Sequence, residues 1–169
     1  GDVYKRQPAQ RRLAFQNGVG DAAYTIPFAV RFDGALDLAR LSCALDGIVA
    51  RHEVLRTRIV DDTQHVDPGE DARIQITEHA IAPTQLDVTI ADLIGRPFHL
   101  ADDLPLRADL LRTAADCAVL LLTVHHIAAD EWSAGTLFDE LAAGYNGVDV
   151  QAPDVQYADH TVAELARLG

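Results

Sequence analysis

The stretch from Cys117 to His126 restricts the fold of this chain more than any other segment. Its four residues 119–122 are all apolar, so a strand here is hydrophobic on both of its faces. A strand of this kind lies inside a sheet and is covered from both sides. We therefore predict a strand over 117–126 at the centre of a sheet, with His125 and His126 at its carboxyl end.

Helical and strand patterns alternate along the rest of the chain. Apolar residues recur at helical spacing over 38–48, whereas 26–32 alternates as a half-buried strand does. Further strands are predicted over 55–59, 74–76 and 106–110, and further helices over 7–17, 84–94, 131–145 and 157–168. Thr84 is the expected N-cap of its helix. Strands that alternate with helices predict an α/β (α+β) sandwich whose mixed sheet is flanked by helices.

The composition indicates one folded unit, and its negative charge disfavours binding to polyanions. The chain has 169 residues, 49% of them hydrophobic, and a formal net charge of −12 at pH 7. This length suits one domain or one large lobe. The negative charge opposes contact with nucleic acid or an anionic membrane, and the longest apolar run, 118–122, is too short to cross a bilayer. Neither nucleic acid nor a membrane is expected as a partner.

Cysteines and lysine are distributed unusually. Cys43 and Cys117 are too few for a disulfide framework, and we predict buried thiols in a reducing, cytoplasmic compartment. Residues 1–7 hold the chain's only lysine, Lys5, and the chain has no methionine. We therefore expect 1–7 to be non-native or disordered and take 8–169 as the folded unit.

The residues after the central strand are the strongest candidates for chemistry. His125 and His126 are followed by Asp130 and Trp132. Strand alternation turns consecutive side chains to opposite faces, so one imidazole can face a cavity while the other packs internally. Histidine suits proton exchange because its ordinary pKa of about 6.5 lies near neutral pH.

Each of these residues also has a structural interpretation. A histidine at a strand end commonly packs in a core, Asp130 suits a helix N-cap, and Trp132 suits a core or a pocket wall. The two histidines and Asp130 could bind a metal, but neighbours that face opposite ways chelate poorly and the HExxH pattern is absent. We predict no metal site.

A second candidate segment is 51–57, which reads RHEVLRT. Taken alone, it is a solvated helix end that leads into an edge strand. Its arginines Arg51 and Arg56 could also reach a buried acid such as Asp130 as a charge-assisted pair.

The chain resembles the condensation domains of nonribosomal peptide synthetases. Residues 124–133 read VHHIAADEWS, which is similar to that family's HHxxxDGWS signature. Four further segments are similar to family motifs in the same order: PAQRRL at 8–13, YTIP at 24–27, RHEVLRT at 51–57, and RPF at 96–98 with PLR at 105–107. QYAD at 156–159 follows the signature as QYADY does in the family.

The resemblance implies a fold like that of chloramphenicol acetyltransferase. Two similar two-layer lobes would form a V with the HHxxxD motif in the cleft, and residues 8–169 would be the N-terminal lobe, without its C-terminal lobe. The inter-lobe face is then expected to expose an apolar patch.

The implied activity is amide formation between a carrier-bound acyl or peptidyl thioester and a carrier-bound aminoacyl acceptor. His126 would act as a general base or position the acceptor amine, and His125 would be structural. Asp130 would pair with Arg56 in preference to Arg51, and Ser133 would order the loop. No cofactor is expected to bind directly, because phosphopantetheine belongs to the donor and acceptor carrier proteins. An adenylation domain is the expected neighbour.

Three residues depart from the family pattern: Glu131 replaces the motif glycine, Ala14 a tryptophan and His160 a tyrosine. Glu131 can still offer its backbone N–H, and its carboxylate adds charge at the cleft mouth. Two other functions stay open at this point. One is an ester-forming acyltransferase of the same fold, and the other is a non-catalytic domain that docks carriers or recruits a tailoring enzyme.

Overall fold

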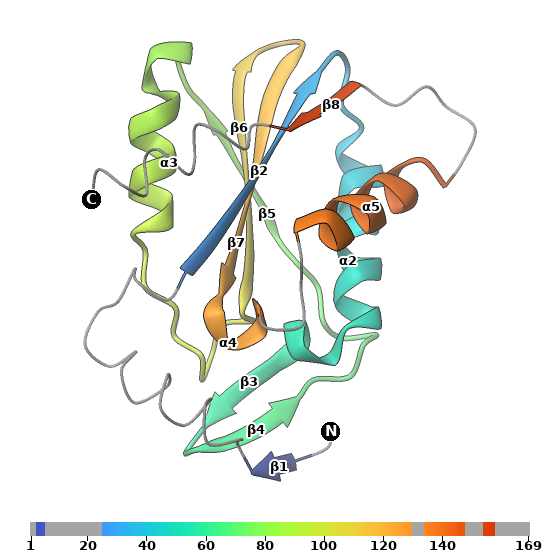
Figure 1. Ribbon diagram of the computed structural model, residues 1–169, viewed down its shortest axis with the longest axis vertical. Helices are drawn as coiled ribbons and strands as arrows, with labels where there is room; N and C mark the ends of the chain where they lie inside the picture. The colour runs from blue at the N-terminus through green and yellow to red at the C-terminus, as the bar shows by residue number, and fades with distance from the viewer. Residues whose placement is uncertain (1–2, 6–24, 130–133, 148–153, 158–169) are drawn as a thin grey trace.

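A computed structural model describes residues 3–5, 25–129, 134–147 and 154–157 (Figure 1). The strands are β1 (Val3–Lys5), β2 (Thr25–Asp33), β3 (Thr57–Val60), β4 (Thr63–Val66), β5 (Ile76–Ala80), β6 (Leu106–Ala114), β7 (Cys117–His125) and β8 (Asp154–Tyr157). The helices are α2 (Leu38–Arg51), α3 (Leu86–Ile94), α4 (His126–Ala129) and α5 (Ala134–Tyr145), with short 3-10 turns η2 (Glu53–Arg56) and η3 (Pro83–Gln85).

The predicted central strand is confirmed. Five strands form the main sheet in the order β5-β6-β7-β2-β8, so β7 is the middle strand. It pairs antiparallel with β2 and β6, which place Phe28 and Ala108 on either side of Leu122. Only β5 and β6 run parallel among the described pairs, so the sheet is mixed, as predicted.

Strand alternation sends β7 side chains to two separate cores. Leu120, Leu122 and Val124 join the larger core, together with buried residues of α2 and α5. Val119 and Leu121 join a smaller core with Ile90 and Leu93 of α3. Figure 1 shows the same arrangement, with α3 on one side of the sheet and α2 and α5 on the other. Burial on both faces explains why 119–122 contains no polar residue.

Several element boundaries differ from prediction. Leu55, predicted to begin a strand, lies in the 3-10 turn η2, and β3 begins at Thr57. His126 is the first residue of α4, so β7 ends at His125. Tyr157, predicted to begin a helix, ends β8, which pairs with β2. The predicted helix over 7–17 lies outside the described residues, as does the rest of 157–168.

The starts of α2 and α3 are built differently. The Asp37 carboxylate caps α2 by accepting the backbone N–H of Arg40 at 3.2 Å. Thr84 does not cap α3, contrary to prediction; it lies inside η3, which leads directly into the helix. Gly95 follows the last helical residue, and its N–H still bonds to the Ala91 carbonyl at 3.1 Å.

A second sheet of three strands, in the order β1-β4-β3, lies at one end of the main sheet (Figure 1). Asp61 and Asp62 join β3 to β4, and both have positive φ angles of 47° and 61°. Val3–Lys5 pairs with β4, so three of the residues set aside as non-native or disordered carry strand hydrogen bonds. The origin of residues 1–7 stays a prediction.

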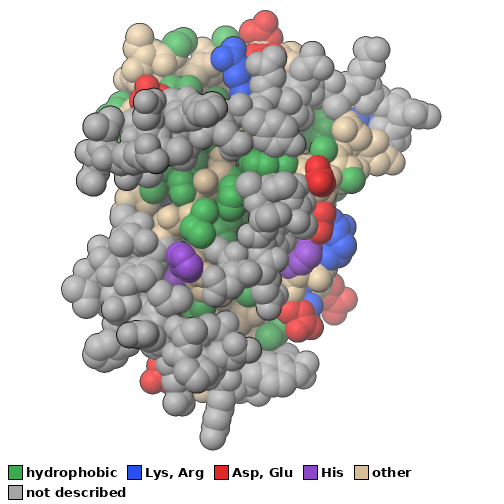
Figure 2. Space-filling view, in the orientation of Figure 1, with side chains coloured by type: hydrophobic (Ala, Val, Ile, Leu, Met, Phe, Trp, Pro, Cys, Tyr) green, Lys and Arg blue, Asp and Glu red, His purple; other side chains and the backbone are tan. Residues whose placement is uncertain are grey.

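One large hydrophobic residue is strongly exposed within the described ranges. It is Val88 on α3, which is 59% exposed, and the apolar inter-lobe patch stays a prediction. Figure 2 shows acidic and basic side chains gathered along one margin, over α2 and α5. Cys43 is exposed and Cys117 half-buried, against the prediction of two buried thiols. No described helix has the length and apolar character needed to span a bilayer.

Candidate active site at the end of the central strand

The predicted histidine pair lies where β7 passes into α4. His125 ends the strand and His126 begins the helix. Because the strand ends between them, alternation along β7 does not fix the direction of His126, and the argument from strand parity stops at His125. His125 is 1% exposed, whereas His126 is half-buried. The histidine expected to be structural is therefore the more deeply buried of the two.

His125 is held as a neutral imidazole. Its Nδ1 accepts the backbone N–H of Ile127 at 3.1 Å, and the backbone N–H of His125 donates to the Pro105 carbonyl at 2.9 Å. Burial, the neighbouring His126 and Arg107 together lower the pKa of His125 to about 4. An imidazole that accepts at Nδ1 carries its proton on Nε2. That buried nitrogen has no hydrogen-bond partner among the described residues.

Four of the predicted site residues, Asp130 to Ser133, lie outside the described residues. Arg56, the predicted partner of Asp130, is described, and its side chain is 14% exposed. Its Nη1 donates to the Asp67 carbonyl at 2.6 Å, and its Nη2 lies 3.5 Å from the Glu53 carboxylate. Its Nε is buried and has no partner within the described ranges. The Asp130–Arg56 pair stays a prediction.

Arg51, the less favoured arginine, has a different partner. Its guanidinium donates to Glu140 of α5 at 3.0 Å, and His52 Nε2 lies 2.9 Å from the same carboxylate. Burial raises the pKa of Glu140, but the hydrogen bonds from His52 and Arg51 outweigh it and lower the pKa overall. Arg51 and His52 therefore join the end of α2 to α5. Glu140 was not found by sequence reasoning, because nothing local marks a tertiary pair 89 residues apart.

The RPF and PLR segments meet beside His125. The Arg107 guanidinium lies 3.9 Å from the centre of the Phe98 ring. It donates to the carbonyls of Arg96 and Pro97 and, at 3.1 Å, to the Asp103 carboxylate. The Phe98 ring also contacts the His125 ring edge-on, with 5.6 Å between the ring centres.

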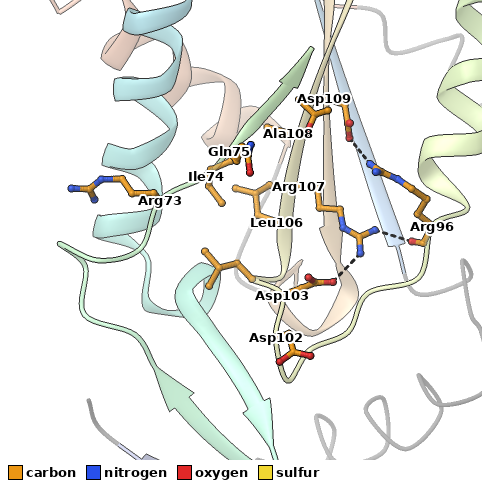
Figure 3. Close-up of a pocket in the computed structure, with 12 residues that line it drawn as sticks. Arg73, Ile74, Gln75, Arg96, Asp102, Asp103, Leu106, Arg107, Ala108 and Asp109 are labelled. Atoms are coloured by element: carbon orange, nitrogen blue, oxygen red, sulfur yellow. Dashed lines mark hydrogen bonds and ion pairs between the residues drawn. The ribbon is translucent and has the colours of Figure 1, made fainter. Parts of the chain in front are cut away.

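A buried carboxylate lies two residues after Arg107, on the same strand β6. Asp109 of β6 is 1% exposed and accepts from Arg96 at 2.9 Å and His79 at 2.8 Å. Asp109 alternates with the apolar residues of 106–110, yet it is buried because α3 covers this face of the sheet. Figure 3 shows Arg96, Arg107, Asp103 and Asp109 along one side of a cavity of about 480 Å³.

Comparison with known proteins identifies the family. The model of the condensation domain matches residues 1–168. The chain belongs to the condensation-domain family. It is 37% identical over 174 residues to the probable non-canonical nonribosomal peptide synthetase CymA of Salinispora arenicola, and 34% identical over 167 residues to surfactin synthase subunit 2 of Bacillus subtilis. Both matches cover 95% of this chain, but only 2% and 5% of the synthetases.

Solved structures agree on the fold. The X-domain from teicoplanin biosynthesis superposes with a TM-score of 0.79 at 29% identity, over 99% of this chain and 39% of that one. That X-domain has also been solved in a complex with OxyB. The starter condensation domain of the rhizomide synthetase RzmA gives a TM-score of 0.74 at 17% identity, over 91% and 40% of the two chains. This chain thus spans about two fifths of these domains, which is consistent with one lobe.

Proposed function

We propose that residues 8–169 are the N-terminal lobe of a condensation domain that forms amide bonds in nonribosomal peptide synthesis. The donor would be an acyl or peptidyl thioester on the phosphopantetheine arm of one carrier protein. The acceptor would be an aminoacyl group on a second carrier, and an adenylation domain would adjoin the module. The position of His126 carries the proposal: it is a half-buried imidazole at the end of the central strand, in a chain of the condensation family.

The chemistry assigned to His126 is proton transfer or positioning at the acceptor amine. The amine nitrogen attacks the thioester carbonyl carbon, a C–N bond forms, and the C–S bond breaks. The proton lost by the amine passes to His126 and then to the departing sulfur, which leaves as a thiol. Because a thioester is already activated, alignment of the two carrier-bound groups can supply much of the rate acceleration.

The remaining predicted residues would support this step. Ser133 would order the loop after the signature, Trp132 would line the core or the pocket wall, and Glu131 would offer its backbone N–H in place of the motif glycine. No cofactor or metal is assigned to the chain itself, since phosphopantetheine arrives with the carrier proteins as part of the substrates. We place this activity in the cytoplasm, where the two thiols described as free stay reduced.

The test is amide formation by the complete two-lobed domain with loaded donor and acceptor carriers, followed by mass spectrometry. His126→Ala is expected to abolish most turnover and to leave the fold intact. His99→Ala, at an exposed histidine, is the matched control and should retain wild-type turnover. Full activity of His126→Ala would reject the proposed role.

The same assay separates the other functions. Product with a hydroxyl acceptor but not with an amine acceptor would indicate an ester-forming enzyme. Carrier or tailoring-enzyme binding without product would indicate a docking domain. The teicoplanin X-domain, which has a related fold, has been solved in a complex with OxyB.

We further propose that Asp130 accepts a hydrogen bond from Arg56, whose buried Nε is available within the described ranges. Asp130→Ala is expected to lower stability by about 3 kcal/mol, and turnover with it, because a largely buried guanidinium loses its counter-charge. Asp92→Ala, at an exposed position of α3, is the control.

A double-mutant cycle isolates this pair. The combined Asp130→Ala and Arg56→Gln variant should lose less stability than the sum of the two single losses. Strict additivity of the two losses would show that the side chains do not interact.

A further inference from the structure

The connection between α3 and β6 contacts both the ring and the backbone of His125. Phe98 contacts the imidazole ring edge-on, at 5.6 Å between centres and 87° between planes. The Pro105 carbonyl accepts the His125 backbone N–H at 2.9 Å. Both Phe98 and Pro105 belong to this one connection, so its conformation sets where the ring and the backbone of His125 lie.

Arg107 holds that connection in place. Its guanidinium donates to the carbonyls of Arg96 and Pro97, the two residues before Phe98, and to the Asp103 carboxylate. Its planar face covers the Phe98 ring at 3.9 Å. A guanidinium offers five N–H donors in a fixed plane, whereas an ammonium does not. Figure 3 shows Arg107 directed toward Asp103 and Arg96.

His125 in turn caps the helix that begins with His126. The first N–H groups of a helix have no acceptor inside that helix. Nδ1 of His125 accepts the N–H of Ile127, the second residue of α4, at 3.1 Å. This is the bond that an N-cap side chain makes. Only a neutral imidazole can accept it, since both ring nitrogens of the charged form carry protons.

We propose that Arg107 is a positioning residue for His126, acting through Phe98 and the N-cap formed by His125. Arg107 fixes the α3–β6 connection, the connection fixes His125, and His125 fixes the start of α4. The inference rests on the proposed function only in taking His126 as the reactive histidine. The chain of contacts from Arg107 to Ile127 can be tested without any assay of activity.

The charged groups around His125 favour its neutral form. His126 is its neighbour in sequence, and Arg107 approaches from β6 with Asp103 bound to it. Opposite His125 on β2 is Thr25, which does not titrate. Burial is the largest cause of the low pKa of His125, His126 the second and Arg107 the third, so removal of the Arg107 charge should raise that pKa slightly.

The experiment is NMR of the 169-residue chain, with ¹⁵N-labelled histidine for the tautomer and pKa of His125 and with hydrogen exchange at the Ile127 amide. Arg107→Gln is expected to raise the pKa of His125 and to speed Ile127 exchange about fivefold, the loss typical of one N-cap. Arg107→Lys should keep the pKa low, because the charge remains, but should still speed exchange. Arg112→Gln is the control, since this β6 arginine pairs with Glu78 on the surface.

Two results would overturn the inference. One is a folded Arg107→Gln chain in which His125 keeps its tautomer and pKa and Ile127 its exchange rate. Should Arg107→Gln not fold, Asp103→Asn decides, because it weakens one partner of Arg107 at a partly exposed site. Faster Ile127 exchange in Asp103→Asn supports the inference, and unchanged exchange rejects it.

Discussion

At the scale of single residues, His125 makes stability depend on pH. Its pKa is about 4 in the folded chain and 6.5 for the ordinary group, so the unfolded chain binds more protons between these values. The contribution of neutral His125 to the free energy of unfolding is fully present above about pH 6.5. It is lost as the pH drops toward 4, by roughly 3 kcal/mol in total. Urea unfolding at a series of pH values measures this loss.

Two variants assign the loss to His125. His125→Gln removes the titrating ring, so the difference in stability between pH 6.5 and pH 4 should shrink by most of that amount. His99→Gln, at an exposed histidine, should keep the wild-type profile. An unchanged profile in His125→Gln would place the titration elsewhere.

Thr123 lowers stability for a different reason, which is an unsatisfied buried hydroxyl. Its hydroxyl is buried on β7 and has no hydrogen-bond partner among the described residues, and its residue is 1% exposed. Thr123→Val keeps the shape and removes the unsatisfied oxygen, so the free energy of unfolding should rise by about 1 kcal/mol. Thr123→Ser keeps the hydroxyl, loses a methyl group and should be less stable than wild type. Urea midpoints compare the three proteins, and a less stable Thr123→Val would mean that the hydroxyl is satisfied.

At the scale of elements, the close approach of α2 and α5 depends on Gly144. A Cβ added there would lie 3.0 Å from the Ala44 Cβ and 3.2 Å from its Cα. Gly144→Ala should therefore lower stability by about 1 kcal/mol, because overpacking exceeds the gain in helix propensity. Gly47→Ala on α2 meets only the flexible end of Arg51, at 3.4 Å, and should raise stability by about 0.5–1 kcal/mol. Thermal unfolding of both variants tests the contrast, and equal effects would contradict it.

The elements that local pattern predicted are those whose burial is complete or periodic. β7, β2 and α2 carry long apolar patterns, and the structure confirms them. Leu55 was wrongly predicted to begin a strand, because its apolar side chain is buried although the residue lies in a 3-10 turn. The burial of Asp109 was not predicted, because its charge is paired by Arg96 and His79 from other segments of the chain, and a local pattern does not show that they approach it. The histidine pair was predicted from its motif, whereas the change from strand to helix between the two rings was not.

At the scale of the whole molecule, the described part is a covered sheet that brings His126 to one end. The chain spans about two fifths of the solved condensation-domain structures that it matches. The apolar patch expected toward a second lobe stays a prediction; among the large hydrophobic residues of the described ranges, Val88 is the one that is strongly exposed.

The last prediction is that the 169-residue chain alone forms no measurable amide, although it contains His126. Two carrier-bound groups must be aligned within about 3–3.5 Å and shielded from water, and one wall of a cleft can do neither. The two-lobed domain should turn over the same loaded carriers, because the second wall restores alignment and excludes solvent. Single-turnover mass spectrometry of both proteins at equal concentration makes the comparison. Amide formed by the chain alone, at a rate near that of the two-lobed domain, would show that His126 and its surroundings suffice without the second lobe.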